Sequence, residues 1–370
     1  MGTRLPTLAT RGRRAMRGLT LIEFMIAIVL GMILVAAIAT LIANQSANRA
    51  ELDRAGKMLE NGRYAVQTMA EDLMMAGYWG ELSAAPGTAT AMPDPCSTTI
   101  AGAGNLQEGT ALHVQGYNAP VTLPTNLAVC VKNHKPGTDI LVVRHVDPDT
   151  SAVEKTSGCT APYSPCVDWS KLKVGQVYLQ TGLNSSGTAL GWALATADGS
   201  TDSTTFAKVR KDKTTGATPR KLVVHIYYIA KCSVEVSNSC TDGDNGNPIP
   251  TLKRVDLGVT SNAPAMQSPI TIAEGIENMQ FDFNRYTDTD KPAAADVDGS
   301  ALTFANWADV KSMKIYLVAR GTEKAPGFTD TKTYVMGTAG AASAPSGDEG
   351  YRRHLFIQSI RLINPSGRGT

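Results

Sequence analysis

The sequence predicts an α+β fold, in which one long N-terminal helix packs on a mainly antiparallel β-sheet with long loops. The helix is indicated by apolar residues at helical spacing within a stretch that has no proline between residues 7 and 85. The sheet is indicated by several later segments that are rich in β-branched and aromatic residues and separated by polar spacers. A chain of 370 residues, 43% of them hydrophobic, has ample material for the core of such a fold.

The first part of the predicted helix has the length and composition of a membrane span. Phe24–Ala43 contains one hydroxyl group, at Thr40, and no charge. At about 1.5 Å per residue its length matches a hydrocarbon core roughly 30 Å thick, and we place the transmembrane part at about residues 21–43. Residues 1–18 hold five arginines and no acid, so the positive-inside rule keeps this end cytoplasmic and the rest of the chain exported.

The helical pattern continues beyond the membrane-length segment. Two sets of apolar and small residues each repeat every seven positions and together form one stripe, with charged residues on the other faces. The stripe consists of Leu52, Ala55, Leu59, Gly62, Val66, Met69, Leu73 and Ala76. We expect the helix to run from about Thr20 to Ala76 and to stop at Gly77, with the stripe covered by the sheet that follows.

The charge balance gives the exported body no bulk attraction for nucleic acids. The whole chain has a formal charge of +2, but without residues 1–18 there are 30 basic and 33 acidic side chains, a charge of −3. A body with this charge does not attract phosphate backbones or anionic lipids. We therefore predict no specific nucleic-acid partner.

Six cysteines follow the apolar segment, and none lies within or before it. They are Cys96, Cys130, Cys159, Cys166, Cys232 and Cys240. In an exported chain an even number of cysteines predicts disulfides. The third and fourth cysteines, and the fifth and sixth, are close enough in sequence for small loops, which leaves the first two as a pair; this is one of fifteen connectivities. A metal site is less favoured, because there is no C-x-x-C and the five histidines show no ligand spacing.

A single carboxylate, Glu23, stands at the start of the apolar run, shortly after Gly18. An ionisable group costs roughly 2.5–3.5 kcal/mol at a bilayer centre and less near the interface, so its presence needs a reason. One interpretation is a side chain that reaches the cytoplasmic edge of the membrane. The other is a contact between subunits: cleavage after Gly18 would give Leu19 a free amine, and Glu23 of one staggered subunit would pair with the amine of another.

The segment RGLTLIEFM, residues 17–25, resembles the class III signal of type IV pilins and type II secretion pseudopilins. In that family a prepilin peptidase cuts after the glycine, here Gly18, and methylates the new N-terminus, here Leu19. The family prefers phenylalanine at that first mature position. The family glutamate at mature position five falls on Glu23.

Two further segments resemble a narrower group, the PilW-type minor pilins. ENGRYA at residues 60–65 and DLMMAGYWG at residues 72–80 match stretches that close the first helix in that group. Trp307 with the following strand, and the closing segment at residues 352–365, resemble its C-terminal region. The helix-kinking proline of many major pilins, near mature position 22, is absent, because that position holds Thr40.

Seven segments are expected to be strands. They are residues 139–146, 174–180, 221–230, 252–258, 276–286, 310–320 and 353–363. We divide the chain into a leader peptide at 1–18, the long helix at 19–77, a loop-rich β region at 78–220 that is a candidate for an inserted subdomain, and a C-terminal β-sheet region at 221–370. Within the second part, residues 83–110 are expected to be loop.

The chain has no Walker loop, G-x-S-x-G, H-E-x-x-H or helix-starting G-x-G-x-x-G, so we expect no catalytic residues. Two acidic clusters are weak calcium candidates without the EF-hand register, and ordinary turns are the favoured interpretation of both. Their residues are Asp242, Asp244, Asn245, Asp288 and Asp290. Apart from calcium we expect no cofactor.

The resemblance implies a minor pilin-like structural subunit of the type IV pilus, which helps to initiate pilus assembly, sits at the tip and catalyses nothing. Its implied partners are other minor pilins, the major pilin, the prepilin peptidase and the inner-membrane assembly machinery. It would lie in the inner membrane, with its C-terminal part in the periplasm, and reach the cell surface after assembly. The alternatives are a type II secretion pseudopilin and, from a different class, a signal-anchored periplasmic binding protein or enzyme, which predicts a polar pocket and no dependence on Glu23.

Overall fold

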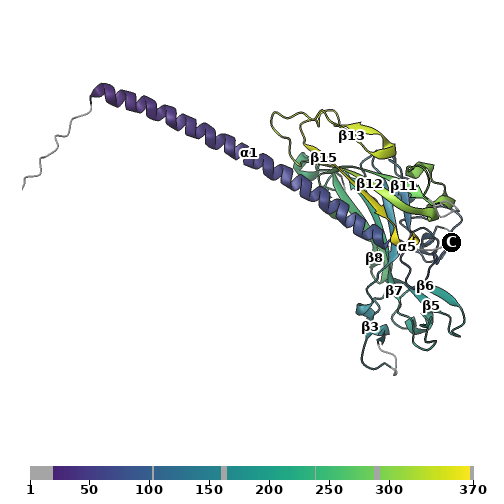
Figure 1. Cartoon of the computed structure of the whole chain (residues 1–370). Coiled ribbons are helices and arrows are strands. Elements are labelled where there is room, and N and C mark those ends of the chain that lie inside the picture. The colour runs from purple at the N-terminus through teal and green to yellow at the C-terminus, as the bar shows by residue number, and fades with distance from the viewer. Residues whose placement is uncertain (1–19, 102–103, 160–164, 238, 287–291, 367–370) are drawn as a thin grey trace, which may run out of the picture. The chain divides into compact units, whose positions relative to one another are not determined.

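The computed structural model describes residues 20–101, 104–159, 165–237, 239–286 and 292–366 (Figure 1). It confirms the predicted α+β class, with one long helix, α1 (Leu21–Met75), followed by antiparallel sheets. The chain divides into two compact units, Met1–Asp53 and Arg54–Thr370. The boundary lies within α1, so the N-terminal part of this helix belongs to the first unit and the remainder of the described chain to the second.

The C-terminal end of α1 lies where the sequence predicts it. Gly77 has a φ of +72°, the left-handed conformation that glycine adopts without steric cost. Its N–H donates to the carbonyl oxygen of Arg144 at 2.9 Å, which ties the end of the helix to the first sheet. The predicted stripe is buried along most of the second unit, but Leu52 is 72% exposed and does not belong to the buried face.

The first sheet has eight strands, and each of its pairings is antiparallel. The path is β1-β2-β7-β5-β6, and β8 pairs with β7, β9 and β10. The strands are β1 (Val114–Tyr117), β2 (Ile140–Val146), β5 (Val177–Leu183), β6 (Leu190–Thr196), β7 (Arg220–Ala230), β8 (Thr251–Thr260), β9 (Ala263–Met266) and β10 (Ile270–Glu274).

The second sheet has three strands in the order β11-β12-β15. They are β11 (Ile276–Arg285), β12 (Val310–Arg320) and β15 (Arg353–Arg361). The register of β11 shifts between Ile276 and Asn278. This irregularity explains why the apolar alternation of the segment skips a position between Ile276 and Met279.

Two hairpins and several short helices complete the described chain. The hairpins pair β3 (Glu154–Lys155) with β4 (Cys166–Val167) and β13 (Thr333–Val335) with β14 (Ala341–Ser343). The short α-helices are α2 (Leu106–Gly109), α3 (Thr125–Ala128), α4 (Asp202–Thr205) and α5 (Ile363–Ser366). The 3-10 helices are η1 (Ser151–Val153), η2 (Trp169–Lys171), η3 (Gly243–Gly246), η4 (Gly299–Ala301), η5 (Phe304–Asp309) and η6 (Gly337–Ala339).

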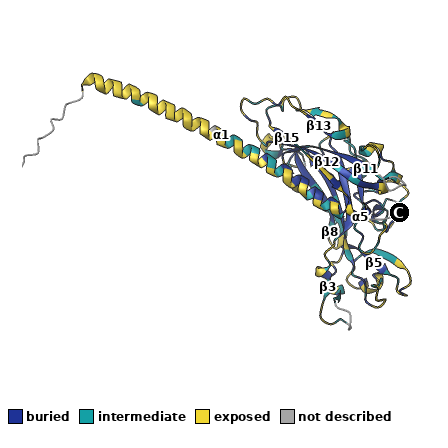
Figure 2. Ribbon diagram, in the orientation of Figure 1, coloured by how far each residue is buried: buried dark blue, intermediate teal, exposed yellow. Residues whose placement is uncertain are grey.

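The main core joins the second half of α1 to both sheets. Met69 and Leu73 of α1 belong to one buried cluster with Tyr227 of β7 and Phe281 of β11. The opposite face of the first sheet is also buried, in a cluster that includes Trp79. Figure 2 shows the result on α1, which is exposed along its N-terminal part and becomes increasingly buried toward its C-terminal end.

The structure differs from the expected division near residue 220. β1 and β2 precede that position, and they share the first sheet with β7 and β8, which follow it. β2 pairs with β7 over six residues, from Leu141 opposite Tyr227 to Val146 opposite Leu222. Strand pairing therefore joins residues 78–220 to the C-terminal β-sheet region, although the loop-rich composition of residues 78–220 suggested a separate subdomain.

Candidate functional site

Thr20 and Glu23 form a reciprocal cap at the N-terminus of α1. The N–H and the hydroxyl of Thr20 donate to Oε2 of Glu23 at 3.0 and 3.1 Å, and the N–H of Glu23 donates to the Thr20 hydroxyl at 3.3 Å. This is a capping box, which satisfies N–H groups that the helix itself leaves without partners. The spacing T-x-x-E was a signal for this role that the sequence interpretation did not use. Gly18 and Leu19 lie outside the described residues.

The apolar part of α1 carries its side chains on the surface. An 18-residue window within the helix is long and apolar enough to cross a membrane, and none of it is buried. Leu21 at its start is 80% exposed, and Ile42 near its end is 61% exposed. In Figure 2 this part of α1 is coloured as exposed throughout most of its length. Such a surface is stable in lipid or against other apolar helices.

The end of α1 is capped by a residue from the end of the described chain. The side-chain amide of Asn364 donates to the carbonyl oxygens of Met74, Met75 and Ala76 at 3.2, 3.3 and 3.3 Å. The last carbonyls of a helix have no partner within it, so this amide replaces the missing donors. The DLMMAGYWG segment and the closing segment at residues 352–365, which both resemble PilW-type minor pilins, thus meet at one joint.

Gly62 marks a second close contact of this joint. A Cβ atom at Gly62 would lie 2.1 Å from the ring of Phe356 on β15, which is a steric clash. The neighbouring Asn61 donates from its side chain to the carbonyl oxygen of Glu274 at 3.1 Å. The ENGRYA segment therefore contacts both sheets, the second through Phe356 of β15 and the first through Glu274 of β10.

A polar cluster lies under α1 on the first sheet. Oδ1 of Asp72 is 3.0 Å from Nε2 of His145 on β2, and Oδ2 is 2.9 Å from Nδ1 of His225 on β7. The hydroxyl of Tyr227 donates to the same Oδ2 at 2.9 Å. Burial alone would raise the pKa of Asp72, but the hydrogen bonds and charges of the two histidines outweigh it and hold this pKa well below its usual range.

The sequence interpretation missed this cluster because its members are far apart in the chain. Asp72 belongs to the DLMMAGYWG segment, whereas the histidines lie on two different strands. One signal was available: both histidines lie in strands close to a valine pair, His145 in VVRHV and His225 in VVHIY. A polar residue on the covered face of a strand needs a partner, and α1 was the predicted cover.

The structure joins the six cysteines in the pairs Cys96–Cys130, Cys159–Cys166 and Cys232–Cys240. These are the pairs that the short sequence separations favoured. The described cysteines include no free thiol. Each disulfide closes a loop of the chain, which removes conformational freedom from the unfolded state.

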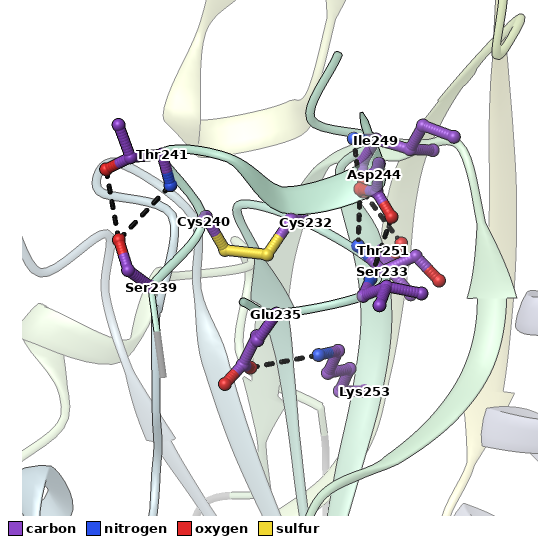
Figure 3. The surroundings of a disulfide bond; sticks show 11 residues. Cys232, Ser233, Glu235, Ser239, Cys240, Thr241, Asp244, Ile249, Thr251 and Lys253 are labelled. Carbon is purple, nitrogen blue, oxygen red and sulfur yellow. Dashed lines mark hydrogen bonds and ion pairs between the residues drawn. A yellow bond between two sulfur atoms is a disulfide. The ribbon is translucent and has the colours of Figure 1, made fainter. Parts of the chain in front are cut away.

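Figure 3 shows the loop between β7 and β8 that contains Cys232–Cys240. The carboxylate of Asp244 accepts hydrogen bonds from the backbone N–H groups of Ser233, Val234 and Ile249 at 2.8–2.9 Å. Asp244 therefore holds the loop together, a role that accounts for its position. Calcium binding in this loop stays a prediction. The candidates of the second acidic cluster, Asp288 and Asp290, lie outside the described residues.

The buried aromatic residues behave as core. Trp79 and Trp307 are each 1% exposed. The ring of Trp307 packs edge-on against Phe283 with a centroid distance of 4.8 Å, an arrangement that aromatic pairs prefer. Trp79 lies in the buried cluster on the opposite face of the first sheet.

Two family models match this chain, one near its N-terminus and one in its C-terminal part. Residues 13–39 match the family model of the prokaryotic N-terminal methylation motif, and residues 226–364 match that of the Type IV Pilus-assembly protein W. The two matches support a PilW-type minor pilin of the type IV pilus. The methylation motif contains the Thr20–Glu23 cap, and the PilW region contains β8, the second sheet and Asn364.

The solved structures that match this chain include a pilin-like protein. A Type IV-like pilin from Thermus thermophilus is 15% identical, with 52% of this chain and 88% of that chain covered and a TM-score of 0.22. No curated protein is similar in sequence to this chain. As a PilW-type minor pilin, the protein has a structural role in the type IV pilus.

Proposed function

We propose that this PilW-type minor pilin helps to initiate type IV pilus assembly from the inner membrane and takes a place at the pilus tip, without catalysing a reaction. The observation that supports the proposal most directly is the exposed apolar half of α1, which starts at a capped carboxylate. An apolar helix of this length needs lipid before assembly and neighbouring helices after it. Its partners would be other minor pilins and the major pilin.

The proposed topology follows from the charge of the leader. The arginines of residues 1–18 would keep that end cytoplasmic, and the disulfide-bonded part would fold in the periplasm, where disulfides persist. The prepilin peptidase would cut after Gly18, and the inner-membrane assembly machinery would then extract the subunit into the pilus.

A catalytic alternative finds little support in the described cavities. A hollow of about 680 Å³ lies beside the Cys96–Cys130 disulfide, and no histidine lines it. Its Lys253 is paired with Glu235 at 3.1 Å. The histidines of the Asp72 cluster lie beneath α1 and do not belong to this cavity. A structural role is therefore the better account.

The test compares three variants that separate the charge of Glu23 from its capping role. Glu23→Gln keeps a side chain that can accept the Thr20 hydrogen bonds, Thr20→Ala removes half of the cap and keeps the charge, and Glu23→Ala removes both. Surface piliation and membrane insertion are measured in cells that carry each variant as the sole copy. If the carboxylate pairs with a neighbouring amine, piliation falls strongly in both Glu23 variants and little in Thr20→Ala.

A fall in Thr20→Ala and Glu23→Ala, with normal piliation in Glu23→Gln, would assign Glu23 to helix capping alone. Normal piliation in Glu23→Ala would remove the charge-pairing mechanism. N-terminal sequencing of the same proteins is the control for processing. We expect the mature chain to start at Leu19, whereas a start among residues 36–40 would indicate an ordinary secreted protein.

A further inference from the structure

Three side chains with metal-binding chemistry converge beneath α1: Asp72 from the helix, His145 from β2 and His225 from β7. One ligand atom from each lies within 4.8 Å of the others. In tetrahedral coordination, bonds of about 2.0–2.2 Å from zinc to nitrogen or oxygen place two ligand atoms roughly 3.3–3.6 Å apart. A shift of at most about 1.5 Å would therefore bring the three atoms onto a single ion.

The hydrogen bonds of the two histidines leave a position that a cation suits. Nδ1 of His145 faces the carbonyl oxygen of Val146 at 3.0 Å, and its Nε2 faces Asp72. Both neighbours are acceptors, but a neutral imidazole has only one N–H. With Nδ1–H donating to Val146, the lone pair of Nε2 points at the cluster. Histidines that bind metals are commonly oriented by such a bond from the other ring nitrogen.

His225 makes one hydrogen bond to the cluster and a longer contact with its other ring nitrogen. Its Nδ1 faces Asp72, and its Nε2 lies 3.8 Å from Oδ1 of Asp256 on β8, the residue opposite it in the sheet. Asp256 is also bound through both oxygens by Arg254, at 2.6 and 2.9 Å. The guanidinium is thus already paired, so it does not neutralise the carboxylate of Asp72.

Tyr227 supports the third member of the cluster. Its hydroxyl donates to Oδ2 of Asp72, which fixes the orientation of the carboxylate. Hydrogen bonds to a ligating carboxylate are typical of metal sites. The side chain of His225 is 17% exposed, against 8% for His145, so water can reach the cluster from the β7 side and complete the coordination of an ion.

We propose that Asp72, His145 and His225 bind one divalent first-row transition-metal ion, which joins the end of α1 to the first sheet. Two imidazoles and one carboxylate suit Zn²⁺ and its neighbours, whereas Ca²⁺ and Mg²⁺ take mainly oxygen ligands. The ion ties a residue of the DLMMAGYWG segment to two strands that come later in the chain. This role is separate from that of Glu23 and goes beyond the proposed function in assembly.

The test uses the full chain, purified in detergent and treated with a chelator. Zn²⁺ is titrated into it by calorimetry, and the midpoint of thermal unfolding is followed with and without the ion. We expect one Zn²⁺ per chain and a midpoint that rises with Zn²⁺ concentration, because an ion that binds only the folded state stabilises it. His145→Gln and His225→Gln should each weaken binding by at least about tenfold, whereas His354→Gln, on the exposed surface of β15, should bind as the wild type does.

X-ray absorption on the wild-type zinc complex keeps the test decisive where a variant does not fold. Scattering from two imidazoles is expected, and Ca²⁺ should not raise the unfolding midpoint through this site. The proposal is overturned if the wild type binds no Zn²⁺ at micromolar concentrations, if the spectrum lacks imidazole ligands, or if folded variants of both histidines bind as tightly as the wild type. In those cases the cluster is a hydrogen-bonded joint without a metal.

Discussion

Single polar side chains stabilise the parts of this protein where backbone N–H and C=O groups lack a backbone hydrogen-bond partner. Glu23 caps the start of α1, Asn364 caps its end, and Asp244 gathers three N–H groups of an irregular loop. Each replaces hydrogen bonds that regular structure would otherwise supply. Two of the three belong to segments that resemble known pilins, so the resemblance marks residues that close the fold.

The contribution of Asn364 can be measured with two substitutions. Asn364→Ala removes the donor from three helix carbonyls and should lower the free energy of unfolding by about 1 kcal/mol. Asn364→Asp has nearly the same shape but places a negative charge against the negative end of the helix dipole, so it should cost about 0.3–1 kcal/mol more. Urea unfolding of the detergent-solubilised chain checks the order. Equal stability of the wild type and both variants would contradict the capping role.

At the scale of elements, α1 is one helix with two different surroundings. Its first part has exposed apolar side chains, and from Met58 onward one face is buried against both sheets. Its glycines reflect this change. A Cβ at Gly56 would have no atom within 4 Å, whereas a Cβ at Gly62 would overlap the ring of Phe356.

These two glycines give a matched pair of substitutions. Gly62→Ala should destabilise the fold by about 1–3 kcal/mol, because the new methyl group overlaps the Phe356 ring and the packing must shift. Gly56→Ala should stabilise it by up to about 1 kcal/mol, because alanine favours the helix and meets nothing. Thermal unfolding of the two variants measures both. A second substitution, Phe356→Leu, should recover part of the loss in Gly62→Ala, and no recovery would place the strain elsewhere.

Whether a feature could be predicted from the sequence depends on how far apart in the chain the interacting residues lie. The bounds of α1 and the strands near residues 140, 221, 276, 310 and 353 were predictable, because apolar periodicity and the stop at Gly77 are local signals. The capping box at Thr20 was equally local but was overlooked. The Asp72 cluster and the pairing of β2 with β7 were not predictable, since strand order and register depend on contacts between distant segments.

At the scale of the second unit, Asp139 joins the two sheets. It lies directly before β2, and its N–H donates to the carbonyl oxygen of Met279 on β11 at 2.9 Å. Its carboxylate accepts from the N–H of Phe281 at 2.8 Å and from the N–H of Ala119 at 2.7 Å. Burial raises the pKa of this carboxyl group to about 7, although the two backbone hydrogen bonds act in the opposite direction.

The raised pKa of Asp139 makes the stability of the protein depend on pH with a defined sign. Between about pH 4 and pH 7 the folded state keeps a proton that the unfolded chain has released, so stability falls as pH rises, by at most about 1.4 kcal/mol per pH unit for this group. Asp139→Asn cannot ionise, and it should be less stable than the wild type at pH 4, because one backbone N–H loses its acceptor. The difference between the two proteins should then shrink as pH rises to 8. Urea unfolding across this range measures the difference, with Asp53→Asn on the exposed surface as the control. A difference in stability that stays constant with pH would show that Asp139 is ionised throughout. The two backbone hydrogen bonds would then affect the pKa of Asp139 more strongly than burial does.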